Sequence, residues 1–95
     1  MILTLLAAAS VLFPGKTPAE VSGRLAAHCV DTHGVVDEAS VGEVRCVWYS
    51  TIVAKYVIFP VEGGTTVQLT RYIDGARVED EASDQEGLNY LASVR

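Results

Sequence analysis

The stretch VRCVWYSTIVAKYVIF, residues 44–59, decides the fold class of this chain. It is rich in β-branched and aromatic residues and contains no Gly, Pro, Asn or Asp, which is typical of β-structure. A usual strand has only about five or six residues, so the stretch is too long for one regular strand. We therefore expect a bend or tight turn inside it, near Ser50-Thr51 or near Ala54-Lys55, and both positions stay open.

The next predicted strand ends at Ile73 and is followed at once by Asp74-Gly75. Both central residues of a two-residue type I′ turn need positive φ, and the Asp-Gly pair meets this need well. The sequence therefore predicts a hairpin in which Ile73 faces Ala76. In this register Tyr72 lies opposite Arg77, so that a guanidinium group could stack on the tyrosine ring.

Residues 17–20, TPAE, predict the start of a helix. Thr17 is the expected N-cap, Glu20 is its capping-box partner, and the proline between them stands at the first helical position. The helix should end near Gly34. Within this helix, apolar residues recur every four positions and place one stripe toward the core: Val21, Leu25 and Cys29.

A second capping box, residues 83–86 with sequence SDQE, predicts a last helix that begins at Ser83. Gly87 lowers the stability of this helix by about 1 kcal/mol relative to alanine. Its short apolar stripe consists of Leu88, Leu91 and Ala92.

Residues 1–13 are almost wholly apolar, and Pro14 follows them. A membrane-spanning helix needs about 20 apolar residues, so we expect no membrane span here. Ala7-Ala8-Ala9 has the small-x-small form of a signal-peptide cleavage site, but the positively charged segment that should precede it is missing. We prefer a first helix or strand that is buried in the fold, and a cleaved signal peptide stays as the alternative.

Length and composition predict a single domain over residues 1–95. The chain is too short for two independent cores, and its 49% hydrophobic and 20% charged residues are the balance of a globular domain. We predict the α+β class, with N-terminal helices packed on an antiparallel β-meander and a short C-terminal helix. The net charge of -5 repels phosphate backbones, so direct nucleic-acid binding is not expected.

Metal-binding and nucleophilic side chains are densest in residues 28–33, HCVDTH. His28 and His33 have a spacing that zinc ligands can show, but the chain has no CxxC pair, and a helix end with a core cysteine explains the same residues. His28 and Cys29 are adjacent, so their side chains diverge by about 100° on a helix and make a poor base and nucleophile. We predict no metal, no cofactor and no catalytic residue, and hence no enzyme.

Cys29 and Cys46 are the two cysteines of the chain. Outside the cytosol they could form one disulfide, which would tie the first helix to the central strands, and inside it they would stay as two buried thiols. The sequence leaves the compartment open, and we prefer the cytoplasm to export.

Aromatic residues in the predicted strands are the first group that could bind a partner. Side chains of a strand alternate between its two faces, and by this parity Trp48 and Tyr56 fall on one face and Tyr49 on the other, while Tyr72 lies in the later strand. If the helices cover only one face, the other leaves an apolar patch of the kind that marks protein interfaces. Alternatively, the N-terminal apolar segment covers that face.

Acidic residues form the second group, which consists of Glu79, Asp80, Glu81, Asp84 and Glu86. They either bind a basic partner or favour the N-terminus of the last helix, where acidic side chains are common. We predict a non-catalytic protein–protein interaction module, whose partner could be a second copy of the chain. One alternative is a small acidic inhibitor of phage type, which would bind a basic partner as a nucleic-acid mimic.

The other alternative is an exported, disulfide-stabilised binding module of the cell envelope. The segment GKTPAEV, residues 15–21, with the antiparallel strands that follow, is loosely similar to the small helix-plus-meander modules of the outer-membrane BamE type. The similarity covers residues 14–78, and no lipid-attachment cysteine follows the apolar start. This resemblance implies an envelope-associated binding module.

Overall fold

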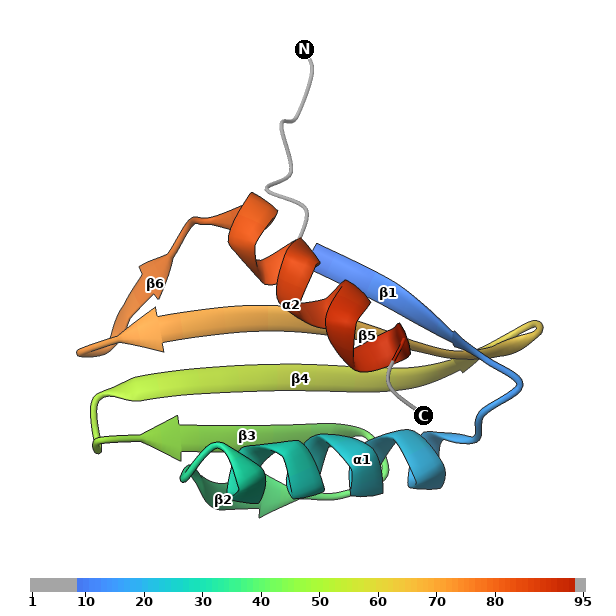
Figure 1. Cartoon of the computed structure of the whole chain (residues 1–95), viewed down its shortest axis with the longest axis horizontal. Helices are drawn as coiled ribbons and strands as arrows, with labels where there is room; N and C mark the ends of the chain where they lie inside the picture. The colour runs from blue at the N-terminus through green and yellow to red at the C-terminus, as the bar shows by residue number, and fades with distance from the viewer. Residues whose placement is uncertain (1–8, 94–95) are drawn as a thin grey trace, which may run out of the picture.

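Within residues 9–93, six antiparallel strands form one sheet, and two helices lie on one of its faces (Figure 1). The computed structural model describes residues 9–93, and the predictions made for residues 1–8 fall outside this range. The α+β class with an antiparallel sheet is confirmed. In chain order the elements are β1 (Ala9–Pro14), α1 (Pro18–Asp31), β2 (Val35–Ala39), β3 (Glu43–Trp48), β4 (Ile52–Val61), β5 (Gly64–Ile73), β6 (Ala76–Val78) and α2 (Glu81–Ser93).

The sheet has the strand order β1-β5-β4-β3-β2, and β6 also pairs with β5. Strands β1 and β6 share one side of β5, because β1 pairs with residues 64–69 and β6 with residues 71–73. The described part of the N-terminal apolar segment is therefore a strand at the edge of the sheet rather than a helix.

Two tight turns close the hairpins at one end of the sheet. The turn between β3 and β4 lies at Tyr49-Ser50, where the φ angles are 55° and 61°, so the first of the two expected positions is confirmed. The turn between β5 and β6 lies at Asp74-Gly75, and Tyr72 pairs with Arg77 as predicted. Only the second turn has the residues that a type I′ turn favours.

Tyr49 and Ser50 both occupy the left-handed region, which costs about 1 kcal/mol or more for a residue with a side chain. We expect the double substitution Tyr49→Asn and Ser50→Gly to raise the free energy of unfolding by about 1–2 kcal/mol, because asparagine and glycine adopt this region readily. Urea denaturation measures the change. An unchanged or lower midpoint would show that the turn carries no strain.

Helix α1 begins as its sequence predicts, and it ends close to Gly34, although His33 rather than Gly34 takes the left-handed conformation. The Thr17 hydroxyl accepts a hydrogen bond from the Glu20 N–H at 3.2 Å, and the Glu20 carboxylate accepts one from the Thr17 N–H at 3.1 Å. At the other end the Gly34 N–H donates to the Cys29 carbonyl, and His33 takes the left-handed conformation with φ of 66°. The His33 N–H also donates to the Val30 carbonyl. The two hydrogen bonds form a Schellman cap, which ends the helix before β2.

Helix α2 begins earlier than its sequence predicts. The helix starts at Glu81, and the Asp80 carboxylate accepts a hydrogen bond from the Ser83 N–H at 3.1 Å. Asp80 is therefore the N-cap, and the predicted start at Ser83 is wrong. Ser83 lies inside the first turn instead, which turns Asp84 toward the sheet.

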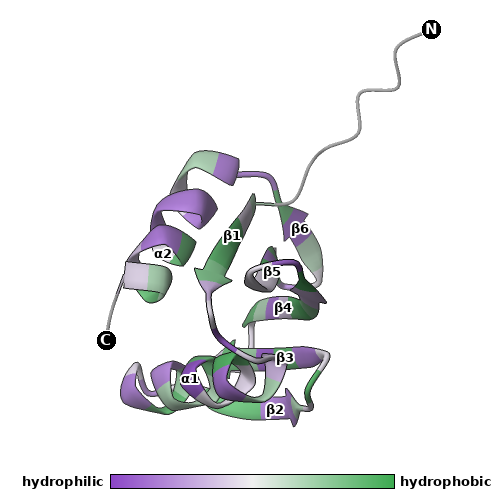
Figure 2. Ribbon diagram, turned by 90° about the vertical axis from the view of Figure 1, so that its right-hand side faces the viewer, coloured by the Kyte–Doolittle hydropathy of each residue, from purple (hydrophilic) through white to green (hydrophobic). Residues whose placement is uncertain are grey.

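Both helices pack on the same face of the sheet, and the core lies between them and the strands (Figure 2). Helix α1 contacts β2, β3 and β4, and α2 contacts β1 and β5. Along each strand, alternate side chains point into this layer. The largest buried residues of the core are Phe13, Val21, Leu25, Val44, Tyr56, Ile58, Val67, Leu69, Leu88 and Leu91.

Candidate functional site

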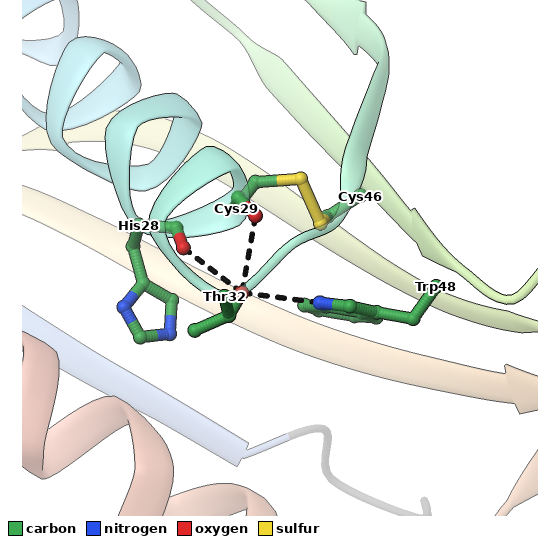
Figure 3. The surroundings of a disulfide bond; sticks show 5 residues. All are labelled: His28, Cys29, Thr32, Cys46 and Trp48. Atoms are coloured by element: carbon green, nitrogen blue, oxygen red, sulfur yellow. Dashed lines mark hydrogen bonds between the residues drawn. A yellow bond between two sulfur atoms is a disulfide. The ribbon is translucent and has the colours of Figure 1, made fainter.

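A disulfide joins the end of α1 to the middle of the sheet (Figure 3). It links Cys29 on α1 with Cys46 on β3, and the two Cα atoms are 5.7 Å apart. Both side chains are at most 1% exposed. The thiol that a zinc site or a nucleophile would need is therefore taken up in this bond.

Trp48 and Thr32 cover the disulfide from one side (Figure 3). The indole Nε1 of Trp48 donates to the Thr32 hydroxyl at 3.1 Å, and this hydroxyl lies 2.9 Å from the His28 carbonyl oxygen. The hydrogen bonds hold the indole ring across the C-terminal end of α1. Trp48 thus contributes to packing around the disulfide, in addition to its role as a predicted binding residue.

Gly34 is required where the chain passes this disulfide. A β-carbon at position 34 would lie 2.8 Å from Cys29 Sγ and 2.9 Å from Trp48 Nε1, and it would clash with Cys46 Sγ as well. Any larger residue must therefore displace the disulfide or the indole. The close approach, rather than an unusual φ angle, explains the glycine.

The predicted aromatic residues do not form one site. Tyr56 is 5% exposed and belongs to the core, Tyr49 is 87% exposed at the tip of its turn, and Tyr72 is half-buried on the opposite face of the sheet from Tyr56. Tyr49 and Tyr72 can reach a partner, whereas the Tyr56 ring is enclosed. For Tyr72 the predicted register with Arg77 is confirmed.

The predicted acidic residues are also divided among different roles. Asp80 caps α2, and Asp84 is 6% exposed and forms an ion pair with Arg71 of β5. Glu79, Glu81 and Glu86 remain exposed. Because two of the carboxylates have partners within the fold, the acidic surface of the last helix is smaller than its sequence indicates.

Tyr56 lies close to the ion pair between Arg71 and Asp84. Burial raises the pKa of Tyr56 to about 12, and the charge of Arg71 opposes this rise while that of Asp84 adds to it. The buried layer between α2 and the sheet therefore combines an apolar core with one ion pair and one neutral phenol.

The raised pKa of Tyr56 predicts a loss of stability in alkali. The neutral phenol is favoured in the folded state, so its contribution is fully present below the unfolded pKa of 10 and is lost as the pH rises toward 12. We expect a loss of about 3 kcal/mol over this interval from Tyr56. Urea denaturation at several pH values measures the free energy of unfolding. Between pH 10 and pH 12 this free energy should fall less steeply for Tyr56→Phe than for the wild type, and as steeply as in the wild type for the control Tyr90→Phe.

Within residues 9–93 one face of the sheet carries no helix, and we call it the helix-free face (Figure 2). Its residues alternate with the core residues along each strand. Its central strands carry valines and one phenylalanine around a lysine. By the strand register, the helix-free face includes Ser10, Leu12, Val35, Glu38, Glu43, Arg45, Val47, Val53, Lys55, Val57, Phe59, Thr66, Gln68, Thr70, Tyr72 and Arg77.

Apolar groups on the helix-free face remain partly in solvent. Val57 and Phe59 of β4 are half-buried, and Leu12 of β1 is 43% exposed. Lys55 lies between Arg45 and Thr70 in the register, and within residues 9–93 it forms no ion pair. The helix-free face thus combines partly exposed apolar side chains with one lysine that has no ion-pair partner in this range.

A cleft of about 420 Å³ separates the two helices on the other face. Arg24 and His28 line it from α1, and Tyr90 and Leu91 line it from α2. Arg24 is held over the Phe13 ring, 5.8 Å from its centroid. Asp31 also lines the cleft and offsets the charge of Arg24, so the cleft has no strong preference for one sign of charge.

No protein-family model, curated protein or solved structure matches this chain. The resemblance to modules of the BamE type therefore has no support from these comparisons. Within residues 9–93, no group of three or more His, Cys, Asp or Glu side chains is placed to hold a metal ion. None of the helices in the same range is long and apolar enough to cross a membrane.

Proposed function

We propose that this chain is a non-catalytic protein-binding module that binds its partner through the helix-free face. The observation that carries the proposal is the row of half-buried apolar side chains on β4, which includes Val53, Val57 and Phe59. Water contacts them in the isolated chain, so covering them with another protein gains about 25 cal/mol per Å² of apolar area. Aromatic side chains such as Phe59 and Tyr72 are the expected energetic anchors.

Lys55 supports the proposal because it stands among these apolar residues without an ion-pair partner in the described chain. Its neighbours on the same face of β4, Val53 and Val57, are apolar, and its cross-strand neighbours are Arg45 and Thr70. A lysine at this place favours partners that offer a carboxylate there, and it disfavours partners that would bury it unpaired. It would therefore contribute specificity more than affinity.

The disulfide supports a location in an oxidising compartment, such as the cell envelope or the outside of the cell. Thiols in the cytosol are kept reduced, and a bond between two fully buried cysteines persists where oxidants form it during folding. We therefore propose the exported, disulfide-stabilised form of the binding module, in place of the cytoplasmic location that we preferred from the sequence.

Site-specific photo-crosslinking in the native host tests the binding face. A photoreactive phenylalanine analogue replaces Val57 on the helix-free face or, as the control, the exposed Tyr90 on α2. We expect a discrete protein adduct from position 57 and none from position 90, with mass spectrometry identifying the captured chain. No adduct from position 57, or the same adducts from both positions, would contradict the proposal.

A further inference from the structure

Within residues 9–93 the sheet has unpaired edges at β2, at β1 and at β6, and two of them are protected against pairing with another strand. Unpaired edge strands readily join other chains unless charges, prolines, bulges or covering groups prevent it. The differences among the three edges therefore indicate where a second chain can add.

The edge of β1 is covered by a side chain of α2. The amide of Gln85 accepts a hydrogen bond from the Ser10 N–H at 3.2 Å and donates one to the Ser10 carbonyl at 2.7 Å. At Ser10 it thereby takes the place of a neighbouring strand. Pro14 faces the same edge by parity with Ser10 and offers no N–H.

The edge of β2 is protected by a bulge and by negative charge. The register with β3 shifts between Val36 and Glu38, so that Asp37 and Glu38 both lie opposite Arg45. The Arg45 guanidinium is 3.7 Å from the Asp37 carboxylate and 3.9 Å from that of Glu38. Two copies of this edge would bring four carboxylates together, which disfavours pairing.

The edge of β6 has neither kind of protection within the described residues. In a two-residue hairpin the residues that flank the turn, Ile73 and Ala76, exchange hydrogen bonds, and the pairs then alternate. The backbone N–H and C=O of Arg77 therefore point away from β5. Glu79 has the same parity, is exposed, and makes no backbone hydrogen bond within residues 9–93.

Charge selects one register for two copies of this edge. The outward-pointing backbone groups belong to residues 77 and 79, so antiparallel copies can pair 77 with 77, 79 with 79, or 77 with 79. The first two registers place like charges opposite one another. The third register forms two equivalent pairs, in each of which Arg77 of one copy lies opposite Glu79 of the other. We propose that two copies of this chain form a dimer through β6 in this third register, with Val78 at the two-fold axis.

The dimer would join two sheets into one. Arg77 and Glu79 project on the same side in this register, so the two-fold axis is perpendicular to the sheet. Both pairs of helices would then lie on one side and both helix-free faces on the other. The dimer adds to the proposed function by offering a partner a doubled binding face. It does not depend on that function, because the chain can be monomeric while a photoreactive residue at position 57 still captures another protein.

Sedimentation of the full chain with reversed charges tests the register. We expect the wild type to dimerise with a dissociation constant between micromolar and millimolar, since the contact is short. Arg77→Glu alone, or Glu79→Arg alone, should weaken the dimer by about tenfold or more, because each change makes two attractive pairs repulsive. The combined Arg77→Glu and Glu79→Arg variant should regain the wild-type constant.

Rescue by the combined variant is the outcome that only a direct contact between Arg77 and Glu79 explains. A wild-type chain that stays monomeric up to about 1 mM would overturn the proposal. So would a dimer that is indifferent to both single reversals, or one that the combined variant fails to restore. Circular dichroism of each variant confirms that the fold is kept, since both side chains are exposed.

A cysteine at the two-fold axis gives a second readout. Val78 faces its own copy in the proposed dimer as a pair without backbone hydrogen bonds, in which the Cα atoms are about 4.5 Å apart. A disulfide can form at this distance. Val78→Cys should therefore give a dimer on a non-reducing gel after mild oxidation, whereas Ser93→Cys, at the end of α2, should not.

Discussion

Replacing both Cys29 and Cys46 by alanine is expected to lower the free energy of unfolding by about 3 kcal/mol. The disulfide closes a loop with a sequence separation of 17, and removing such a link restores conformational entropy to the unfolded chain. Small domains have only about 5–15 kcal/mol of stability in total. Because α1 is tied to the sheet by this bond, we expect its contacts with β2 and β3 to be lost first on denaturation.

Urea denaturation of the oxidised wild type, the reduced wild type and the double-alanine variant measures this effect. Reduction and substitution should give the same loss within about 1 kcal/mol, the difference reflecting the missing sulfur atoms in the core. If the double-alanine variant were as stable as the oxidised wild type, the disulfide would not stabilise the fold. The reduced and oxidised wild types share one sequence, so they form the matched comparison.

Asp84→Ala is expected to cost about 2–3 kcal/mol, the second-largest effect of a side-chain change. Asp84 is buried and pairs with Arg71, whose side chain is 27% exposed, and removing the carboxylate leaves the guanidinium without a counter-ion beside the core. Breaking a fully buried pair costs about 3–5 kcal/mol, and partial exposure of Arg71 reduces this figure.

Two further variants separate charge from packing at this pair. Glu86→Ala removes an exposed carboxylate from the same helix and should change stability by no more than about 0.5 kcal/mol. The combination Arg71→Met with Asp84→Leu removes both charges and should restore most of the stability, because no unpaired charge remains. Equal losses for Asp84→Ala and Glu86→Ala would contradict the account of a buried, structural pair.

Local sequence signals were sufficient for the parts of the fold that depend on neighbouring residues. The capping box of Thr17 and Glu20 and the turn at Asp74-Gly75 both rest on contacts within four residues, and the structure confirms both. The turn at Tyr49-Ser50 carries no such signal. Pairing of the whole of β3 with residues 52–57 of β4 imposes the turn on residues that do not favour it.

The roles of the last helix could not be predicted, because they depend on distant partners. Gln85 bonds to Ser10, 75 positions away, and Asp84 pairs with Arg71 of another element. Sequence spacing alone made Asp84 an ordinary acid at a helix start. Likewise, strand alternation showed that both faces of the sheet carry aromatic rings, but only the topology shows which face the helices leave uncovered.

Hydroxyl-radical footprinting, compared between the purified protein and the native host cell, tests the central claim most directly. We expect Phe59 and Tyr72 on the helix-free face to be oxidised in the purified protein and protected in the cell, where a partner covers them. The exposed Tyr90 should be oxidised equally in both, and the buried Phe13 in neither. Equal oxidation of Phe59 and Tyr72 in the cell and in the purified protein would contradict the claim that this face binds a partner.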